Sequence, residues 1–180
     1  MSSAFFLKAL QHTYRMEGRF SDVAQDAGGP TDFGISLRFL KSLPDLDGDL
    51  DGNGHVDEFD IKVMTPSDAS TLYRKYFWDW YRLDEIQHER IAVKVFDLLV
   101  NMRSKQAVRI VQRGLRACNK AVLEDGLLGE KTFAAINALH NELNLVAAMR
   151  SEAWGHYRLI VAADSSQKIF LNGWKNRAYS

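Results

Sequence analysis

The sequence predicts a mainly α-helical fold that carries one small β-hairpin, and three observations lead to this prediction. Apolar residues recur every three to four positions in several segments, as they do in helices with one buried face. Glycines and polar residues crowd one short region, residues 18–36. Hydrophobic residues make up 46% of the 180-residue chain, which is enough for a packed core without disulfide bonds. The single cysteine, Cys118, cannot form an internal disulfide and is expected to be a partly buried helix residue.

The predicted elements follow in order along the chain. The first helix covers Ser3–Met16, whose apolar residues share one face. Residues 18–36 predict a short hairpin and a tight loop because they are dense in turn residues. Ser36 is placed to cap a helix that runs to about Ser42, and Pro44 closes that helix.

A further helix is expected to begin at Pro66, and helical spacing recurs through the second half of the chain. Four segments there show it: Ile91–Met102, Lys105–Cys118, Lys131–Leu139 and Leu143–Val161. No repeat, low-complexity tract or Pro/Ser linker interrupts them. We therefore expect the two halves of the chain to pack into one globule.

The charges balance over the whole chain but not within its halves. Acidic side chains outnumber basic ones in residues 1–90, and the reverse holds in residues 91–180. Six basic residues of the second half are spaced mostly three or four apart, which predicts a cationic stripe on a helix: Arg103, Lys105, Arg109, Arg113, Arg116 and Lys120. The stripe is either a solvated helix face or a surface for an anionic polymer.

Neither a transmembrane helix nor a signal peptide is predicted. No apolar run reaches the length that spans a bilayer. The segment Met1–Leu10 has a short apolar patch but no charged leader before it and no small-residue cleavage site after it. We therefore expect synthesis in the cytosol.

The most informative segment runs from Glu17 to Ile35. A carboxylate, Glu17, closes the first helix, a second carboxylate, Asp26, follows across a turn, and the hydroxyl of Thr31 lies beside paired glycines. Cleavage of a glycosidic bond needs a proton donor for the leaving oxygen and a carboxylate or positioned water on the opposite face of the sugar. A Glu held against aromatic side chains can keep its proton near neutral pH, while a hydrated Asp stays ionised.

This segment resembles the N-terminal signature of the muramidases of glycoside hydrolase family 108, found in phage endolysins and related bacterial proteins. Five later motifs resemble the family in the same order: Leu72–Trp78, Val95–Asn101, Gln112–Leu115, Asp125–Thr132 and Gly173–Arg177. The chain departs from the family pattern at Arg19, where a glycine is usual, and at Met102-Arg103, where Ser-Gly is usual. These departures affect the shape of the catalytic turn and the wall-binding face, and they remove no reacting group.

The resemblance implies a lysozyme-like helical fold with Glu17 as the catalytic acid. Asp26 and Thr31 would position or activate the attacking water. Residues 1–90 would form the catalytic muramidase lobe, and residues 91–180 a helical peptidoglycan-binding region packed into the same globule.

Residues 45–60 are almost all Asp, Gly and Asn, and they resemble the calcium loop of an EF-hand. Alternating oxygen donors around a glycine suit a hard cation such as Ca²⁺. Two registers compete, one starting at Asp47 and one at Asp49. The second is preferred because it places Gly54 at the sharp turn and Val56 at the apolar anchor. Its ligands would be Asp49, Asp51, Asn53, the backbone carbonyl of His55, Asp57 and Asp60. A flexible acidic loop without a metal is the alternative, and a single loop suggests one structural or regulatory ion.

Several aromatic residues could stack on sugar rings. Phe33, Tyr73 and Trp78 are the candidates for substrate binding, although aromatics at helical spacing more often belong to the core. The other histidines are scattered without metal-ligand spacing, which disfavours a zinc peptidase or amidase. No nucleophile elbow and no phosphate-binding glycine loop is visible.

The sequence thus predicts a peptidoglycan hydrolase of the endolysin type. It would cleave the β-1,4 bond between N-acetylmuramic acid and N-acetylglucosamine, bind Ca²⁺, and act as a monomer in the periplasm after release through the inner membrane. No nucleic-acid partner and no stable membrane insertion is expected. Two alternatives are a non-catalytic peptidoglycan-binding protein and a calcium-responsive regulatory protein.

Overall fold

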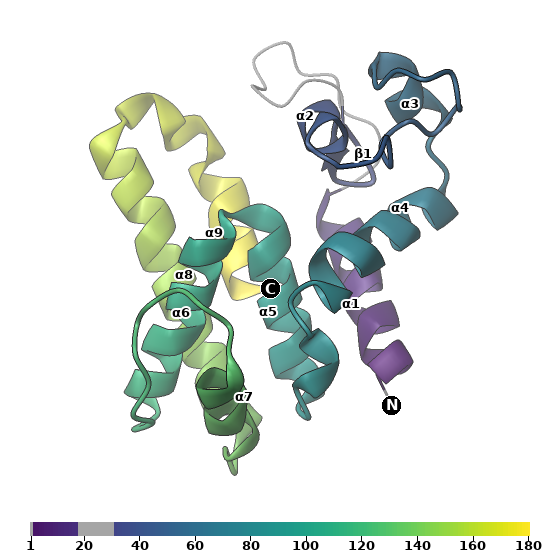
Figure 1. Cartoon of the computed structure of the whole chain (residues 1–180). Coiled ribbons are helices and arrows are strands. Elements are labelled where there is room, and N and C mark those ends of the chain that lie inside the picture. The colour runs from purple at the N-terminus through teal and green to yellow at the C-terminus, as the bar shows by residue number, and fades with distance from the viewer. Residues whose placement is uncertain (1, 18–30) are drawn as a thin grey trace. The chain divides into compact units, whose positions relative to one another are not determined.

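The computed structural model describes residues 2–17 and 31–180 of the chain. Helices dominate these residues, and one short antiparallel hairpin accompanies them (Figure 1). The predicted fold class, mainly helical with a small hairpin, is therefore confirmed. The chain divides into two compact units: the hairpin unit, Leu10–Tyr76, and the helical unit, which joins Phe77–Ser180 to the residues up to Ala9.

The hairpin lies where the turn-dense segment ends. Its strands are β1, Thr31–Asp32, and β2, Ile35–Ser36, and Thr31 pairs with Ser36. Phe33 and Gly34 form the two-residue turn between them, with φ angles of 50° and 80°. A tight hairpin turn of this kind requires positive φ at both central residues, which glycine adopts without steric cost.

Short helices complete the hairpin unit after the strands. They are α2, Leu37–Lys41; α3, Glu58–Val63; and α4, Pro66–Tyr73. The side chain of Ser36 caps α2 by accepting a hydrogen bond from the N–H of Phe39 at 3.3 Å, as predicted. Pro66 occupies the first turn of α4, where a missing N–H costs no hydrogen bond. After α4 the chain continues as a π-helix, η1, Arg74–Asp79.

The helical unit contains the four helices predicted for the second half of the chain. They are α5, Glu89–Asn101; α6, Ser104–Ala117; α7, Glu130–Asn137; and α8, Glu142–Ala163. Each end agrees with its prediction to within two residues. Three further segments were not predicted: the 3₁₀ turns η2, Leu83–Glu85, and η3, Ser165–Phe170, and the helix α9, Leu171–Tyr179.

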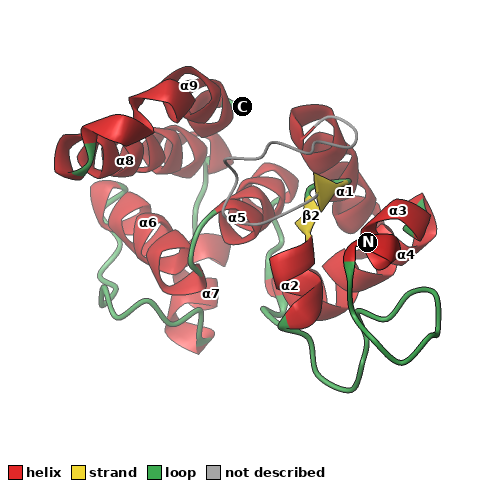
Figure 2. Ribbon diagram, turned by 90° about the horizontal axis from the view of Figure 1, so that it is seen from above, coloured by secondary structure: helices red, strands yellow, loops and turns green. Residues whose placement is uncertain are grey.

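Helices α6 and α8 form the centre of this unit, and α5 and α9 pack beside them (Figure 2). Gly114 of α6 lets the two helices approach closely, because a Cβ atom there would lie 2.9 Å from Cδ1 of Leu145. The surrounding core consists of fully or almost fully buried apolar residues: Ile91, Val95, Phe96, Ile110, Val111, Leu115, Leu145, Met149 and Ala153. Burial of these side chains supplies the main driving force for folding this unit.

The first helix, α1, Ser2–Glu17, contributes residues to both units. In its first half Phe6 is buried and packs edge-on against Trp78 and Phe96, with ring centroids 5.5 and 6.1 Å apart. Lys8 pairs with Glu89 at 2.7 Å. The beginning of α1 is therefore part of the core of the helical unit.

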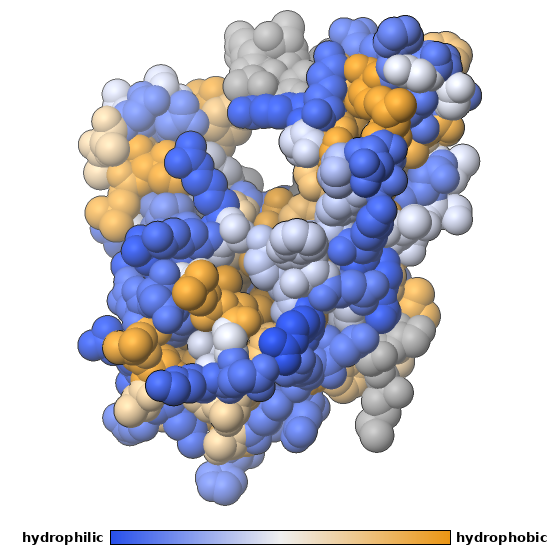
Figure 3. Space-filling model, viewed as in Figure 1, coloured by the Kyte–Doolittle hydropathy of each residue, from blue (hydrophilic) through white to orange (hydrophobic). Residues whose placement is uncertain are grey.

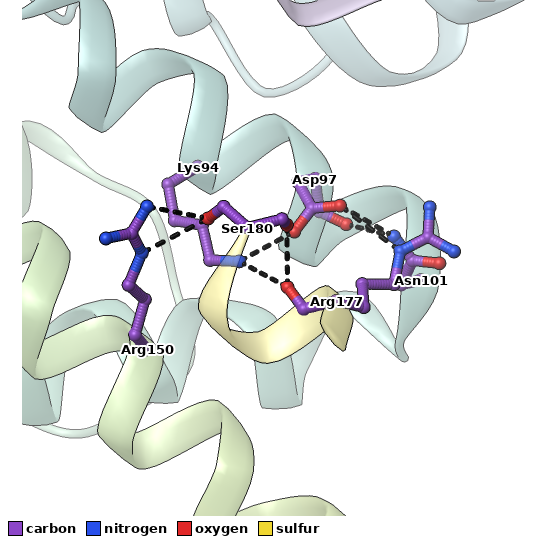
Figure 4. Close-up of polar contacts among 6 residues, drawn as sticks. All are labelled: Lys94, Asp97, Asn101, Arg150, Arg177 and Ser180. Atoms are coloured by element: carbon purple, nitrogen blue, oxygen red, sulfur yellow. Dashed lines mark hydrogen bonds and ion pairs between the residues drawn. The ribbon is translucent and has the colours of Figure 1, made fainter. Parts of the chain in front are cut away.

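A buried polar network fixes α9 to α5 (Figure 4). The ammonium group of Lys94 donates to a carboxylate oxygen of Asp97 and to the carbonyl oxygen of Arg177, both at 2.9 Å. Asp97 also accepts hydrogen bonds from Asn101 at 3.1 Å and from Nε of Arg177 at 3.3 Å. The guanidinium of Arg150 donates to the carbonyl oxygen of Ser180 at 3.0 and 3.1 Å.

In the described part of the chain, no helix has the length and apolar character needed to cross a bilayer. Apolar surface is nevertheless present on the helical unit, where it gathers over the end of α8 and η3 (Figure 3). Leu159, Ile169 and Phe170 are exposed there.

Candidate functional site

Two of the three predicted acid–base residues lie at the ends of described elements. Glu17 is the last residue of α1, as the sequence predicted, and Thr31 is the first residue of β1. Asp26 lies outside the described residues. Glu17 and Thr31 both fall within the hairpin unit, Leu10–Tyr76. The catalytic roles of the three residues stay predictions.

Tyrosines hold the hairpin turn against the helices of its unit. The hydroxyl of Tyr73, on α4, donates to the carbonyl oxygen of Phe33 at 3.0 Å. The ring of Tyr14, on α1, lies 5.5 Å from the ring of Phe33, and its hydroxyl donates to the carbonyl oxygen of Pro66 at 3.2 Å. Burial raises the pKa of Tyr14 to about 12. The turn between β1 and β2 is thus fixed from two helices.

The three aromatic residues proposed for substrate binding have different environments. Phe33 is half-buried in the hairpin turn, whereas Tyr73 and Trp78 are 1% and 0% exposed. Trp78 packs against Phe96 at 5.8 Å, and its indole N–H donates to Asp84. Tyr73 and Trp78 therefore lie in the core here, which is the alternative that the sequence left open. Contact of any of the three with substrate remains a prediction.

Three carboxylates of the aspartate loop converge. Asp49, Asp51 and Asp60 each place one oxygen within 4.8 Å of the others. Asp60 is fully buried, and its carboxylate accepts hydrogen bonds from the N–H groups of Leu50 at 2.7 Å and Asp57 at 2.7 Å. A buried carboxylate is stable only with such partners or with a cation.

Asp49 is held by the turn that follows it. It accepts hydrogen bonds from the N–H groups of Gly52, Asn53 and Gly54 at 2.8–3.1 Å. Burial alone would raise the pKa of Asp49, but these hydrogen bonds lower it. Gly54 has a φ angle of 87°, in agreement with the sharp turn predicted at this position. The backbone therefore offsets part of the repulsion between the carboxylates.

The remaining predicted ligands contribute to local turns. Asn53 donates to Asp51 from its backbone and from its side-chain amide, and its side-chain oxygen accepts from the N–H of His55 at 2.8 Å. Asp57 caps α3 by accepting from the N–H of Phe59 at 2.7 Å. Asp57 is thus not one of the three carboxylates that converge, and Asn53 is bonded to one of them, Asp51.

Asp47, the start of the competing register, is engaged elsewhere. Its carboxylate accepts hydrogen bonds from the ammonium of Lys75 and the hydroxyl of Tyr76, on η1, and these contacts lower its pKa. Gly48 packs closely on α2, since a Cβ atom there would lie 2.5 Å from the carbonyl oxygen of Leu40. Asp47 is therefore a tether between the loop and η1. The sequence showed no signal for this tether because its partners lie far along the chain.

The cationic stripe is partly neutralised within the helical unit. Arg113 pairs with Glu124 at 2.6 Å and with Glu152 at 3.9 Å, and Arg116 lies 3.7 Å from Glu124. Lys120 donates to the carbonyl oxygen of Ala138 at 2.9 Å. These contacts fit a solvated helix face with ion pairs, and binding of an anionic polymer by the stripe stays a prediction.

Comparison with known proteins decides the family. The model described as glycosyl hydrolase 108 matches residues 10–102, which is more than half of the chain. The chain belongs to the glycosyl hydrolase 108 family. A second family model, described as a predicted peptidoglycan domain, matches residues 106–179. The resemblance seen in the sequence is thus confirmed for the family and for its peptidoglycan domain.

A solved structure shows the same fold. The structure titled "Structure of Brucella abortus SagA" matches with a TM-score of 0.73 and 21% sequence identity, over 98% of this chain and 90% of that one. A search of curated proteins gave no match. The family and its peptidoglycan domain together identify this glycosyl hydrolase 108 member as a glycoside hydrolase that acts on peptidoglycan.

Proposed function

We propose that the chain is a muramidase that hydrolyses the β-1,4 bond between N-acetylmuramic acid and N-acetylglucosamine. The family match over residues 10–102 carries this proposal, because it includes Glu17, Asp26 and Thr31. The position of Glu17 at the end of α1 and of Thr31 at the start of the hairpin supports it.

In the proposed mechanism, Glu17 gives its proton to the glycosidic oxygen as the bond to the leaving sugar breaks. Asp26 and Thr31 orient the water that attacks the anomeric carbon. The hydrogen bond from Tyr73 to Phe33 holds the hairpin turn close after Thr31. The geometry of the hairpin is thereby supported from α4, which a positioned water requires.

Mass spectrometry of digested sacculi tests the bond specificity. A muramidase releases fragments whose new reducing end is N-acetylmuramic acid, whereas reducing N-acetylglucosamine would contradict the proposal. Glu17→Gln should lose at least about a hundredfold in rate, the lower range for general acid catalysis. Glu130→Gln, at an exposed surface ion pair, serves as the matched control and should retain the parent rate.

We also propose that residues 49–60 bind one Ca²⁺ ion. The convergence of Asp49, Asp51 and Asp60 supports an oxygen-rich cation site, and the engagement of Asp47 elsewhere supports the register. Asp60 in place of the longer Glu at the last position argues for weak binding, on the order of 10⁻⁴–10⁻³ M. Such a site would fill outside the inner membrane, and so the proposed place of action is the periplasm.

Calorimetric titration with Ca²⁺ and with Mg²⁺ tests this second proposal. The parent should bind one Ca²⁺ ion, and the variant Asp49→Ala/Asp51→Ala should bind none. Heats indistinguishable between parent and variant would contradict it.

A further inference from the structure

A groove of about 400 Å³ lies on the helical unit, within the match to the peptidoglycan domain. One wall comes from α6 through Arg113, and α8 supplies the remaining lining residues, among them Ser151, Gly155, His156 and Arg158. The groove is open to solvent, and Leu159 borders it with 68% of its surface exposed. Its chemistry indicates which part of the wall polymer it suits.

Among the described lining residues, Arg158 is the cation of this groove that is open to a ligand. Arg113 and Arg158 face it together with a single acidic residue, Glu152. Arg113 is already paired with Glu124 at 2.6 Å, and it lies 3.9 Å from Glu152. Among the residues that the structure describes, none forms an ion pair with Arg158, which is exposed. The planar guanidinium of an arginine binds a carboxylate through two parallel hydrogen bonds. An anionic ligand is therefore favoured.

The lining does not suit a neutral sugar. Sites for sugar rings commonly present the face of a Tyr, Trp or Phe ring, and no such side chain lines the groove in the described residues. Tyr157, next to the lining residue His156, is 5% exposed and stacks on Trp174 with ring centroids 5.1 Å apart. Its ring is consequently committed to the core of the unit.

Gly155 provides room at the centre of the α8 wall. A Cβ atom built at Gly155 would meet no heavy atom within 4 Å, so the helix surface is open there. The absence of a side chain in mid-helix costs helix stability, roughly 1 kcal/mol relative to alanine. Space at this position admits a ligand backbone with small side chains close to α8.

We propose that this groove binds the stem peptides of peptidoglycan, with Arg158 contacting their carboxylates and Gly155 providing clearance for their backbone. Stem peptides carry free carboxylates and alanine methyl groups, whereas the N-acetylglucosamine units of the glycan are neutral. The proposal rests on peptidoglycan as the substrate. Binding of the peptides would hold the enzyme on cross-linked wall while the hairpin unit acts on the glycan.

The test uses the full chain and two soluble probes, an isolated stem tetrapeptide and a neutral tetramer of N-acetylglucosamine. Titration followed by calorimetry or NMR should show binding of the tetrapeptide to the parent. Gly155→Trp should weaken that binding at least tenfold by filling the groove. Arg158→Gln should also weaken it at least tenfold by removing a charged donor.

Matched controls separate the groove from the fold. Gly173→Trp places the same side chain on α9, where a Cβ atom also meets nothing within 4 Å, and it should bind the tetrapeptide like the parent. Lys175→Gln removes an exposed charge from the same helix and should behave likewise. Melting temperatures of all four variants establish that they are folded, and Arg158→Gln decides the question should Gly155→Trp fail to fold.

Three results would overturn the inference. The parent does not bind the tetrapeptide, or the folded groove variants bind it as tightly as the parent does, or these variants lose as much affinity for the sugar tetramer as for the tetrapeptide. The proposed hydrolysis is measured separately as release of reducing ends from sacculi. A parent that cleaves sacculi but does not bind the peptide refutes the groove alone. A parent that binds the peptide but cleaves no glycan refutes the proposed muramidase alone.

Discussion

Replacement of Asp97 by alanine should destabilise the helical unit severely. Asp97 is 1% exposed and accepts hydrogen bonds from Lys94, Asn101 and Arg177. Lys94 is itself 3% exposed. The substitution leaves its ammonium group buried with the carbonyl oxygen of Arg177 as an acceptor but without a counter-charge.

The magnitude follows from this burial. Removing one partner of a buried ion pair costs about 3–5 kcal/mol, a large share of the roughly 5–15 kcal/mol by which domains are stable. For a protein of this size that loss corresponds to a melting temperature lower by about 6–20 °C. Glu130→Ala breaks the exposed pair with Arg82 and should cost at most about 1 kcal/mol, since water screens that pair.

The pH dependence gives the prediction a second readout. Burial lowers the pKa of Lys94 below its ordinary value of 10.5, although the charge of Asp97 opposes this shift. Between the lowered pKa and 10.5 the unfolded chain binds more protons than the folded one, so stability from this group rises with pH. Without Asp97 the pKa of Lys94 falls further. The difference in unfolding free energy between the parent and Asp97→Ala should therefore shrink as the pH rises from 7 towards 10.

The assay is thermal unfolding of the parent, Asp97→Ala, Glu130→Ala and the double variant Lys94→Met/Asp97→Leu. The double variant removes both charges of the Lys94–Asp97 pair and should recover part of the loss, because apolar side chains can replace a buried pair although Arg177 still loses its contact with Asp97. Hydrogen exchange of the α9 amides should accelerate in Asp97→Ala. If Asp97→Ala melts within about 2 °C of Glu130→Ala, the network does not stabilise α9 as argued.

Three further predictions concern the hairpin unit and the groove. Asp26→Asn and Thr31→Ala should each slow lysis of chloroform-treated Gram-negative cells, Asp26→Asn the more, with nearly unchanged melting temperatures; lysis by both at the parent rate would refute their role with the water. Chelator should lower the melting temperature or lytic rate of the parent but not of Asp49→Ala/Asp51→Ala, and no change in the parent would exclude a functional calcium site. Burial, with the nearby charge of Arg113, lowers the pKa of His156 below 6.5, so stability should fall as the pH drops through 6.5. In His156→Gln the unfolding free energy measured with urea should fall less than in the parent between pH 7.5 and 5, and an equal fall in both proteins would contradict this explanation.

Helix caps and first-turn prolines predicted where helices begin, because these residues act within a single turn of the chain. Ser36 caps α2 because its side chain bonds within its own turn, and Pro66 begins α4 because its ring suits a first helical turn. The helices α5 to α8 were predicted from apolar residues that recur every three to four positions. Helix α9 was missed because few of its residues are buried and its main anchor is polar, with Lys94 reaching Arg177 across 83 residues. Long-range pairs of this kind leave no periodic trace in a sequence.

The candidate site was predictable to a similar extent. The convergence of Asp49, Asp51 and Asp60 agrees with the spacing of a cation loop, in which the ligand positions face inward by local turn geometry. The burial of Tyr73 was not decided by the sequence, since an aromatic residue on a helix suits a core as well as a cleft. The groove lined by Arg113 and Arg158 depends on the packing of α6 against α8, which only the tertiary structure gives.

The division of α1 between the two units has a consequence for folding and for fragments of the chain. Lys8 and Glu89 meet across 81 residues, so the hairpin unit is a chain insertion whose two ends enter the helical unit. Closing so long a loop costs entropy, which early folding of the inserted segment would reduce by bringing its ends together. After a protease cut in Leu10–Tyr76, Phe6 would lie on a different fragment from Trp78 and Phe96. Its contacts with these two rings would then join two separate chains. A fragment that starts at the family boundary near residue 103 would lose α5, which packs against α6 and α8, so the match to the peptidoglycan domain does not by itself delimit a segment that folds alone.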